Sequence, residues 1–216
     1  MSRSFCAYKK YLLALCVSVT FCYVSCNEKK ESTTQKQLDT SILKEYDVEF
    51  LNSTVWLPPN YEKLTYEAIF ELAKVSDDRF VNTLLQSSKE YRDKEEKPVF
   101  FRDELMPSNF IAIYPRPYLA LTKEAASYYI SDFAATMKRE DQQYGRTSEI
   151  IEKRIKNFRG HKMVKLKVKQ EFAFKNNHHF MQYFISSDIR SFMIIHIDVL
   201  NNDYELNFKE LSLKSN

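Results

Sequence analysis

The chain has 216 residues, of which 28% are charged and 44% hydrophobic, and its formal net charge is +3. This composition excludes a disordered chain and a polytopic membrane protein, and the length suits one domain with a short tail. Gly145 and Gly160 are the only glycines, so a glycine-rich dinucleotide loop, a P-loop and the nucleophile elbow of serine hydrolases cannot be formed. All four cysteines lie within the first 26 residues, which leaves none for the body of the chain.

Residues 1–25 have the order of a signal peptide. Arg3, Lys9 and Lys10 come first, no acid is present, and an apolar run follows from Tyr11 to Ser25. This run is shorter than the roughly 20 residues that cross a bilayer as a helix. We therefore predict that the segment is cleaved and does not remain as an anchor.

The end of this run, Val24-Ser25-Cys26, resembles the lipobox of bacterial lipoproteins. The resemblance implies that Cys26 becomes the mature N-terminus and carries acyl chains such as palmitate, which would hold the protein on a membrane. Tyr23 departs from the family pattern, which usually has an aliphatic residue at that position. In Gram-negative lipoproteins an Asp after the cysteine favours the inner membrane, so Asn27 favours the outer membrane. The alternatives are an ordinary secretory signal, in which Cys26 is incidental, and an uncleaved anchor.

A polar linker follows the signal. Residues 27–37 contain no apolar side chain, and this composition is typical of a solvated connector. We place the lipidated cysteine and the linker at 26–44 and a single α+β domain at 45–216. Removal of residues 1–25 would leave 29 basic and 29 acidic residues, so the positive net charge belongs to the signal.

The first half of the domain is predicted to alternate strands and helices. Tyr46 to Leu57 reads as one strand that ends at Pro58-Pro59. Thr65 is a candidate N-cap for a helical pattern that is interrupted near Ser76 and continues through Phe80, Leu84 and Leu85. A charged turn at 93–98 precedes short strands at 99–102 and 109–114.

The second half is predicted to hold a long helix and a meander. Thr122 caps the helix, whose apolar stripe consists of Ala126, Tyr129, Ile130, Phe133, Ala134 and Met137. Residues 147–158 fit either a short helix or a hairpin strand. Strands at 164–174, 180–185 and 192–200 then form an antiparallel meander, and a helix at 203–213, capped by Asn202 or Asp203, closes the domain.

This order predicts an α+β fold, with helices packed on a mostly antiparallel sheet. The run Asn109-Phe-Ile-Ala-Ile-Tyr-Pro115, the long helix, Gly160 with the strand through Val168, and the last strands and helix are similar to the Mog1/PsbP-like α/β/α sandwich, over about residues 45–213. The helical stretch at 65–90 exceeds that pattern. The superfamily is mostly noncatalytic, so the resemblance implies an assembly factor, an extrinsic subunit or a binding adaptor.

Few residues suggest chemistry. His196 and Asp198 share one strand face, where a carboxylate could orient an imidazole for base catalysis; we interpret them as a polar pair on the solvent side of the sheet. Adjacent residues of a strand point to opposite faces, so His178 and His179 cannot easily bind one metal. No catalytic residue, metal site or cofactor is predicted. Five aromatic residues could line an apolar cleft or belong to the core: Trp56, Tyr114, Tyr118, Tyr128 and Tyr129.

Residues 149–170 carry an excess of six positive charges. Within them Lys165, Lys167 and Lys169 alternate with apolar residues, so we name these three as a candidate contact for anionic lipid or an acidic partner. The alternative is a solvated strand face. Nucleic acid is not expected, because the lysines lack an aromatic stacking platform.

The sequence therefore predicts an exported, lipid-anchored protein of the bacterial cell envelope that acts as a noncatalytic binding or assembly module. Cys26 is its lipidation site, and its partners are the membrane and an envelope protein, with the oligomeric state left open. The alternative is an envelope hydrolase that uses His196 and Asp198.

Overall fold

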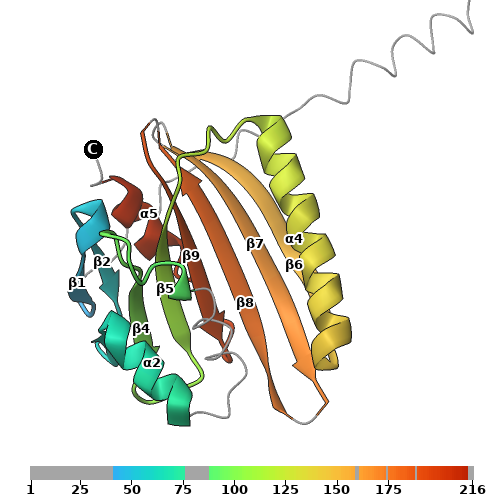
Figure 1. Cartoon of the computed structure of the whole chain (residues 1–216), viewed down its shortest axis with the longest axis horizontal. Coiled ribbons are helices and arrows are strands. Elements are labelled where there is room, and N and C mark those ends of the chain that lie inside the picture. The colour runs from blue at the N-terminus through green and yellow to red at the C-terminus, as the bar shows by residue number, and fades with distance from the viewer. Residues whose placement is uncertain (1–40, 76–87, 159–160, 174, 188, 214–216) are drawn as a thin grey trace, which may run out of the picture. The chain divides into compact units, whose positions relative to one another are not determined.

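The computed structural model describes residues 41–75, 88–158, 161–173, 175–187 and 189–213. Its main feature is a seven-stranded sheet in which all neighbouring strands are antiparallel (Figure 1). The strand order is β3-β4-β5-β9-β8-β7-β6. The bounds are β3 Tyr61–Leu64, β4 Val99–Asp103, β5 Phe110–Arg116, β6 Arg146–Phe158, β7 His161–Phe172, β8 Lys175–Ser186 and β9 Ser191–Asp198.

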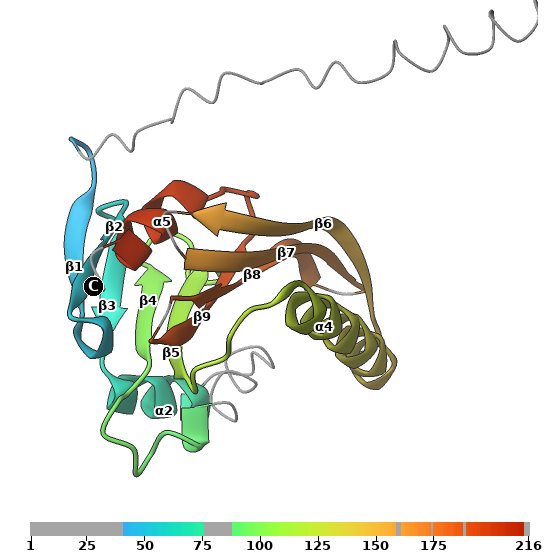
Figure 2. The same cartoon turned by 90° about the horizontal axis from the view of Figure 1, so that it is seen from above.

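Both faces of the sheet are covered. Helices α2 (Tyr66–Val75) and α4 (Lys123–Tyr144) lie on one face, and α5 (Glu205–Leu213) lies on the other with the hairpin of β1 (Lys44–Val48) and β2 (Ser53–Leu57) (Figure 2). Each face has its own buried apolar cluster. The predicted α+β class is confirmed, since an antiparallel sheet is packed with helices. No helix of the described ranges is long and apolar enough to cross a bilayer.

The predicted strand from Tyr46 to Leu57 is wrong, because this stretch is a hairpin. A 3-10 turn at Glu49–Leu51 ends at Asn52, whose φ of 48° lies in the left-handed region. Asparagine tolerates this conformation better than most residues, so the chain reverses and β1 pairs with β2. The short strand β3, which follows Pro58-Pro59, was not predicted.

The predicted starts of α2 and α4 are confirmed. The Thr65 hydroxyl accepts a hydrogen bond from the Ala68 backbone N–H at 3.1 Å, at the start of α2. Thr122 accepts one from the Ala125 N–H at 3.1 Å, at the start of α4. Helix α4 ends at Gly145, whose φ of 61° suits a residue without a side chain. Phe80, Leu84 and Leu85 lie outside the described residues.

Residues 147–158, left open between helix and strand, belong to β6. The pairing of β6 with β7 shifts by one residue between Ile150 and Glu152, which is a β-bulge. Paired residues share a face, and Ile150, Lys153 and Ile155 pair with Val168, Leu166 and Val164, which lie on one face of β7. The bulge therefore places Ile150 and Lys153, three residues apart, on one face, as in a helix, and interrupts the regular alternation of the strand.

The predicted meander and closing helix are confirmed. Strands β7, β8 and β9 are consecutive neighbours in the sheet. The Asp203 carboxylate accepts a hydrogen bond from the Glu205 N–H at 3.0 Å, at the start of α5. Phe208 and Leu211 of α5 are fully buried against the sheet. This helix decides the environment of the polar residues that the sequence singles out.

Candidate functional site

The three lysines of β7 do not form an exposed surface. Lys165 is fully buried and Lys167 is 8% exposed. Only Lys169 is substantially exposed, and its ammonium pairs with Glu171 at 2.6 Å. The prediction of a half-exposed lysine face is therefore wrong for Lys165 and Lys167. Lys165 is buried because the segment at the start of α5 covers it and binds its ammonium.

Lys165 instead joins the sheet to α5. Its ammonium donates to an Asp203 oxygen at 2.6 Å and to a Glu205 oxygen at 2.9 Å, and it lies 3.6 Å from a carboxylate oxygen of Glu152 on β6. Glu205 also accepts from Lys156 of β6 at 2.7 Å. The acids at the start of α5 therefore hold that helix onto β6 and β7.

The electrostatics of this cluster favour the charged forms. Burial acts to lower the pKa of Lys165, but its hydrogen bonds to Asp203 and Glu205 outweigh burial and raise the pKa above its ordinary value. Burial acts to raise the pKa of Asp203, and Lys165 more than compensates, so that pKa is lowered. The anions that Lys165 binds thus belong to its own chain.

His196 and Asp198 also lie beneath α5. The His196 Nε2 atom is 3.9 Å from an Asp198 oxygen, and both side chains are fully buried. The imidazole stacks on Tyr204, with 4.9 Å between the ring centroids and 20° between the planes. The two residues share a face, as predicted, but the prediction that this face is in solvent is wrong, because Tyr204 and α5 cover it.

The environment of this pair is unsuited to base catalysis. Burial lowers the pKa of His196 to about 4, although nearby Asp198 opposes the change, so the imidazole is neutral at pH 7. The Asp198 carboxylate accepts hydrogen bonds at 3.0 Å from the backbone N–H and the side-chain amide of Asn202. Asp198 therefore holds the turn that leads to α5. Because both side chains are fully buried, no substrate can reach the imidazole in this packing.

The remaining candidates, the histidine pair and the five aromatic residues, do not come together in one site. His178 and His179 pair with Gln170 and Lys169 of β7 and so lie on opposite faces, and His178 Nε2 is 2.9 Å from the Gln170 side-chain oxygen. The described ranges contain no group of three His, Cys, Asp or Glu side chains that could hold a metal ion. The aromatic candidates are scattered: Tyr114 is buried, whereas Tyr128 is 74% exposed.

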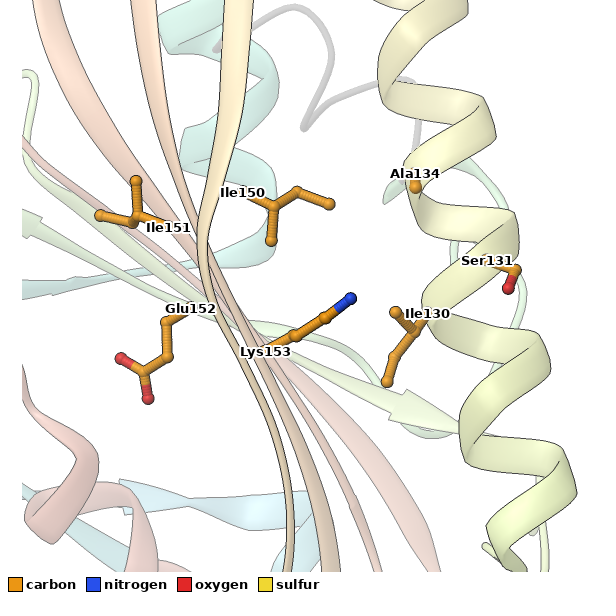
Figure 3. A pocket seen from close by; sticks show the side chains of 7 residues that line it. All are labelled: Ile130, Ser131, Ala134, Ile150, Ile151, Glu152 and Lys153. Carbon is orange, nitrogen blue, oxygen red and sulfur yellow. The ribbon is translucent and has the colours of Figure 1, made fainter.

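An open groove of about 380 Å³ lies between α4 and β6 (Figure 3). Its volume falls within the range of about 300–1,000 Å³ of small-molecule sites. It is lined by Ile130, Ser131 and Ala134 of α4 and by Ile150, Ile151, Glu152 and Lys153 of β6. None of the five aromatic candidates lines it.

The bulge in β6 sets the chemistry of this groove. Ile150 and Lys153 both point toward α4, whereas Ile151 and Glu152 point away from it (Figure 3). In a regular strand, residues three apart would lie on opposite faces, so the bulge is what brings the ammonium beside the isoleucine. The Glu152 carboxylate is held on the other face by Arg154 and lies near Lys165. The charge presented to the groove is therefore positive.

Sequence reasoning missed the groove and Lys153. The one available signal was the helix-like spacing of Ile150, Ile151 and Ile155 in a segment that also suits a hairpin. A bulge produces this combination, but no residue type marks its position. The apolar stripe of α4 was predicted correctly, and Ile130 and Ala134 of that stripe form the opposite wall.

No protein-family model matches the sequence, and no curated protein sequence is similar to it. Among solved structures, the chain is similar to the solution structure of cyanobacterial PsbP (CyanoP) from Synechocystis sp. PCC 6803. The TM-score is 0.47 and the sequence identity 12%, over 74% of this chain and 82% of that chain. The α+β class itself rests on the strand pairing and helices described above.

Proposed function

We propose that this chain is an exported envelope protein, tethered to a membrane through a lipid on Cys26, and that its domain acts by binding. The tether is supported by the sequence alone. Residues 1–25 place basic residues before an apolar run, and Val24-Ser25-Cys26 resembles a lipobox. These residues lie outside the described part of the chain. The polar residues 27–37 would belong to the segment that connects the lipid to the domain.

The burial of His196 and Asp198 is the observation that supports binding over catalysis. This pair is the best candidate for base catalysis in the sequence, and α5 seals it. The groove between α4 and β6, by contrast, opens to solvent and combines apolar walls with one ammonium group. A site of this kind can hold a ligand or a partner, and the Ser131 side chain points away from Lys153 (Figure 3).

The hydrolase alternative would require substrate to reach His196. Tyr204 would have to leave the imidazole ring, and the contacts of Lys165 with Asp203 and Glu205 would have to break. No observation favours such an opening, so binding remains our proposal.

Replacement of Cys26 by serine should abolish lipid attachment, because a hydroxyl cannot form the thioether that carries the acyl chains. We expect the full-length variant to take up no alkyne-labelled palmitate and to leave the membrane fraction or to stall before cleavage. Cys22→Ser is the matched control and should behave as the wild type. A Cys26→Ser protein that is still labelled and membrane-bound would contradict the proposed tether.

We further propose the outer membrane as the location, because Asn27 stands where Asp would favour retention at the inner membrane. Density-gradient separation of the two membranes should place the wild-type protein in the outer fraction. Asn27→Asp should shift it toward the inner one. Recovery of the wild type with the inner membrane would refute this location without affecting the tether.

A further inference from the structure

The groove between α4 and β6 differs from a simple gap in an apolar core, because its walls combine two kinds of side chain. Ile130 and Ala134 on the helix and Ile150 on the strand give it apolar sides. Lys153 points into it from β6 (Figure 3). An apolar site with one charged side chain selects a ligand that has an apolar body and an oppositely charged end.

Lys153 has its charge available for such a ligand. Its side chain is exposed, and it forms no ion pair within the described ranges. The neighbouring cations of β6 are already engaged, since Arg146 pairs with Glu140 and Asp141, and Lys156 pairs with Glu205. Basic side chains elsewhere on this strand therefore serve the fold, whereas Lys153 is free to bind.

No acid in the lining opposes this charge. Glu152 is turned to the other face and bound by Arg154. At the far end of α4, Asp141 is occupied by Arg146 at 2.7 Å and by the Ser148 N–H and hydroxyl at 3.0 and 2.6 Å. The electrostatic complement of the groove is thus an anion.

We propose that this groove binds a single-chain fatty-acid carboxylate, with the acyl chain between Ile130, Ala134 and Ile150 and the carboxylate on Lys153. The volume of about 380 Å³ lies at the low end of the range for small-molecule sites, which favours one chain over a two-chain phospholipid. A single lysine provides one compact positive charge, which balances the single negative charge of a carboxylate. This inference rests on the proposed function, in which the domain acts by binding.

The test uses the full-length protein in phosphatidylcholine nanodiscs and a dodecanoate probe that carries a photoactivatable diazirine. Mass spectrometry should locate the adduct in 123–158, and unlabelled dodecanoate should suppress it. A probe with the same chain and a trimethylammonium head should label at least about tenfold less, because a charge-assisted hydrogen bond is lost and replaced by repulsion.

Variants then test the two parts of the site. Lys153→Glu should reduce labelling about tenfold, Lys153→Arg should preserve it, and Ala134→Trp should block it by filling the groove. Lys169→Glu, on the other face of the sheet, is the matched control and should have no effect. Because Lys153 makes no ion pair with a described residue, the unfolding midpoint of Lys153→Glu should equal that of the wild type.

Any of three labelling results would overturn the proposal: no adduct in 123–158, equal labelling by the cationic probe, or unchanged labelling of Lys153→Glu. Competition by phosphatidylglycerol nanodiscs as strong as that by dodecanoate would refute the single-chain ligand in favour of a phospholipid. The labelling can also be carried out on the Cys26→Ser protein in solution, because the groove does not depend on the tether. Failure of the tether and failure of the fatty-acid site are therefore distinguishable.

Discussion

Replacement of Lys165 by methionine should lower the free energy of unfolding by about 3 kcal/mol. Methionine keeps most of the apolar volume of the lysine stem, so the loss isolates the charge. Without the ammonium, Glu205 and Asp203 would face each other across a largely buried site. Removal of one partner of a buried ion pair costs about 3–5 kcal/mol, and the 37% exposure of the Asp203 side chain places the effect at the lower end.

The matched control lies on the same strand and face. Lys169 also pairs with a carboxylate, Glu171, but the two side chains are 43% and 50% exposed. Exposed ion pairs contribute at most about 1 kcal/mol, so Lys169→Met should have a small effect. Urea unfolding of the two variants measures the difference. If both variants lose less than about 1 kcal/mol, the buried contacts of Lys165 do not hold α5 in place.

The largest expected pH effect comes from His196. Its pKa is about 4 in the folded protein and about 6.5 in an unfolded chain. Between these values the unfolded state binds more protons, so stability falls as the pH is lowered from about 6.5 to about 4. At 1.36 kcal/mol per pKa unit, the total loss is about 3 kcal/mol.

His196→Phe should remove this pH dependence. The imidazole makes no hydrogen bond in the described structure and stacks on Tyr204, so a phenyl ring can replace it without leaving a polar partner behind. Asp198, Asp203, Lys165 and Lys167 act on the imidazole and remain in both proteins. The test compares urea unfolding of wild type and variant between pH 4 and 7. Equal pH dependence, or an imidazole that titrates near 6.5 by NMR, would contradict a sealed, neutral His196.

The cover of one sheet face by α5 explains why two predictions were wrong: the exposure of Lys165 and the exposure of the pair His196 and Asp198. Alternation along β7 and β9 predicted correctly that Lys165 and Lys167 share a face and that His196 and Asp198 do so. Alternation does not reveal whether the polar face is in water. Here it is covered by α5, and the acids that neutralise Lys165 lie 38 and 40 residues further along the chain. Local patterns contain no information about such a pairing.

Local signals were sufficient where a short-range interaction decides the structure. The hydroxyls of Thr65 and Thr122 cap the helices that their sequences predicted, and the strands of the meander follow the alternating or continuous apolar residues of their sequences. They failed where one residue changes the backbone direction. Asn52 turns a predicted strand into a hairpin, and the bulge after Ile150 gives β6 a helix-like spacing. The groove depends on that bulge and could not be predicted.

Hydrogen–deuterium exchange of the full-length protein, with and without dodecanoate, tests most directly whether the domain acts through its α4–β6 groove. We predict slower exchange in α4 and β6 on addition of dodecanoate and unchanged exchange in β9 and α5. Protection of β9 and α5, with α4 and β6 unaffected, would contradict this account, because it would place the functional face over His196 and Asp198.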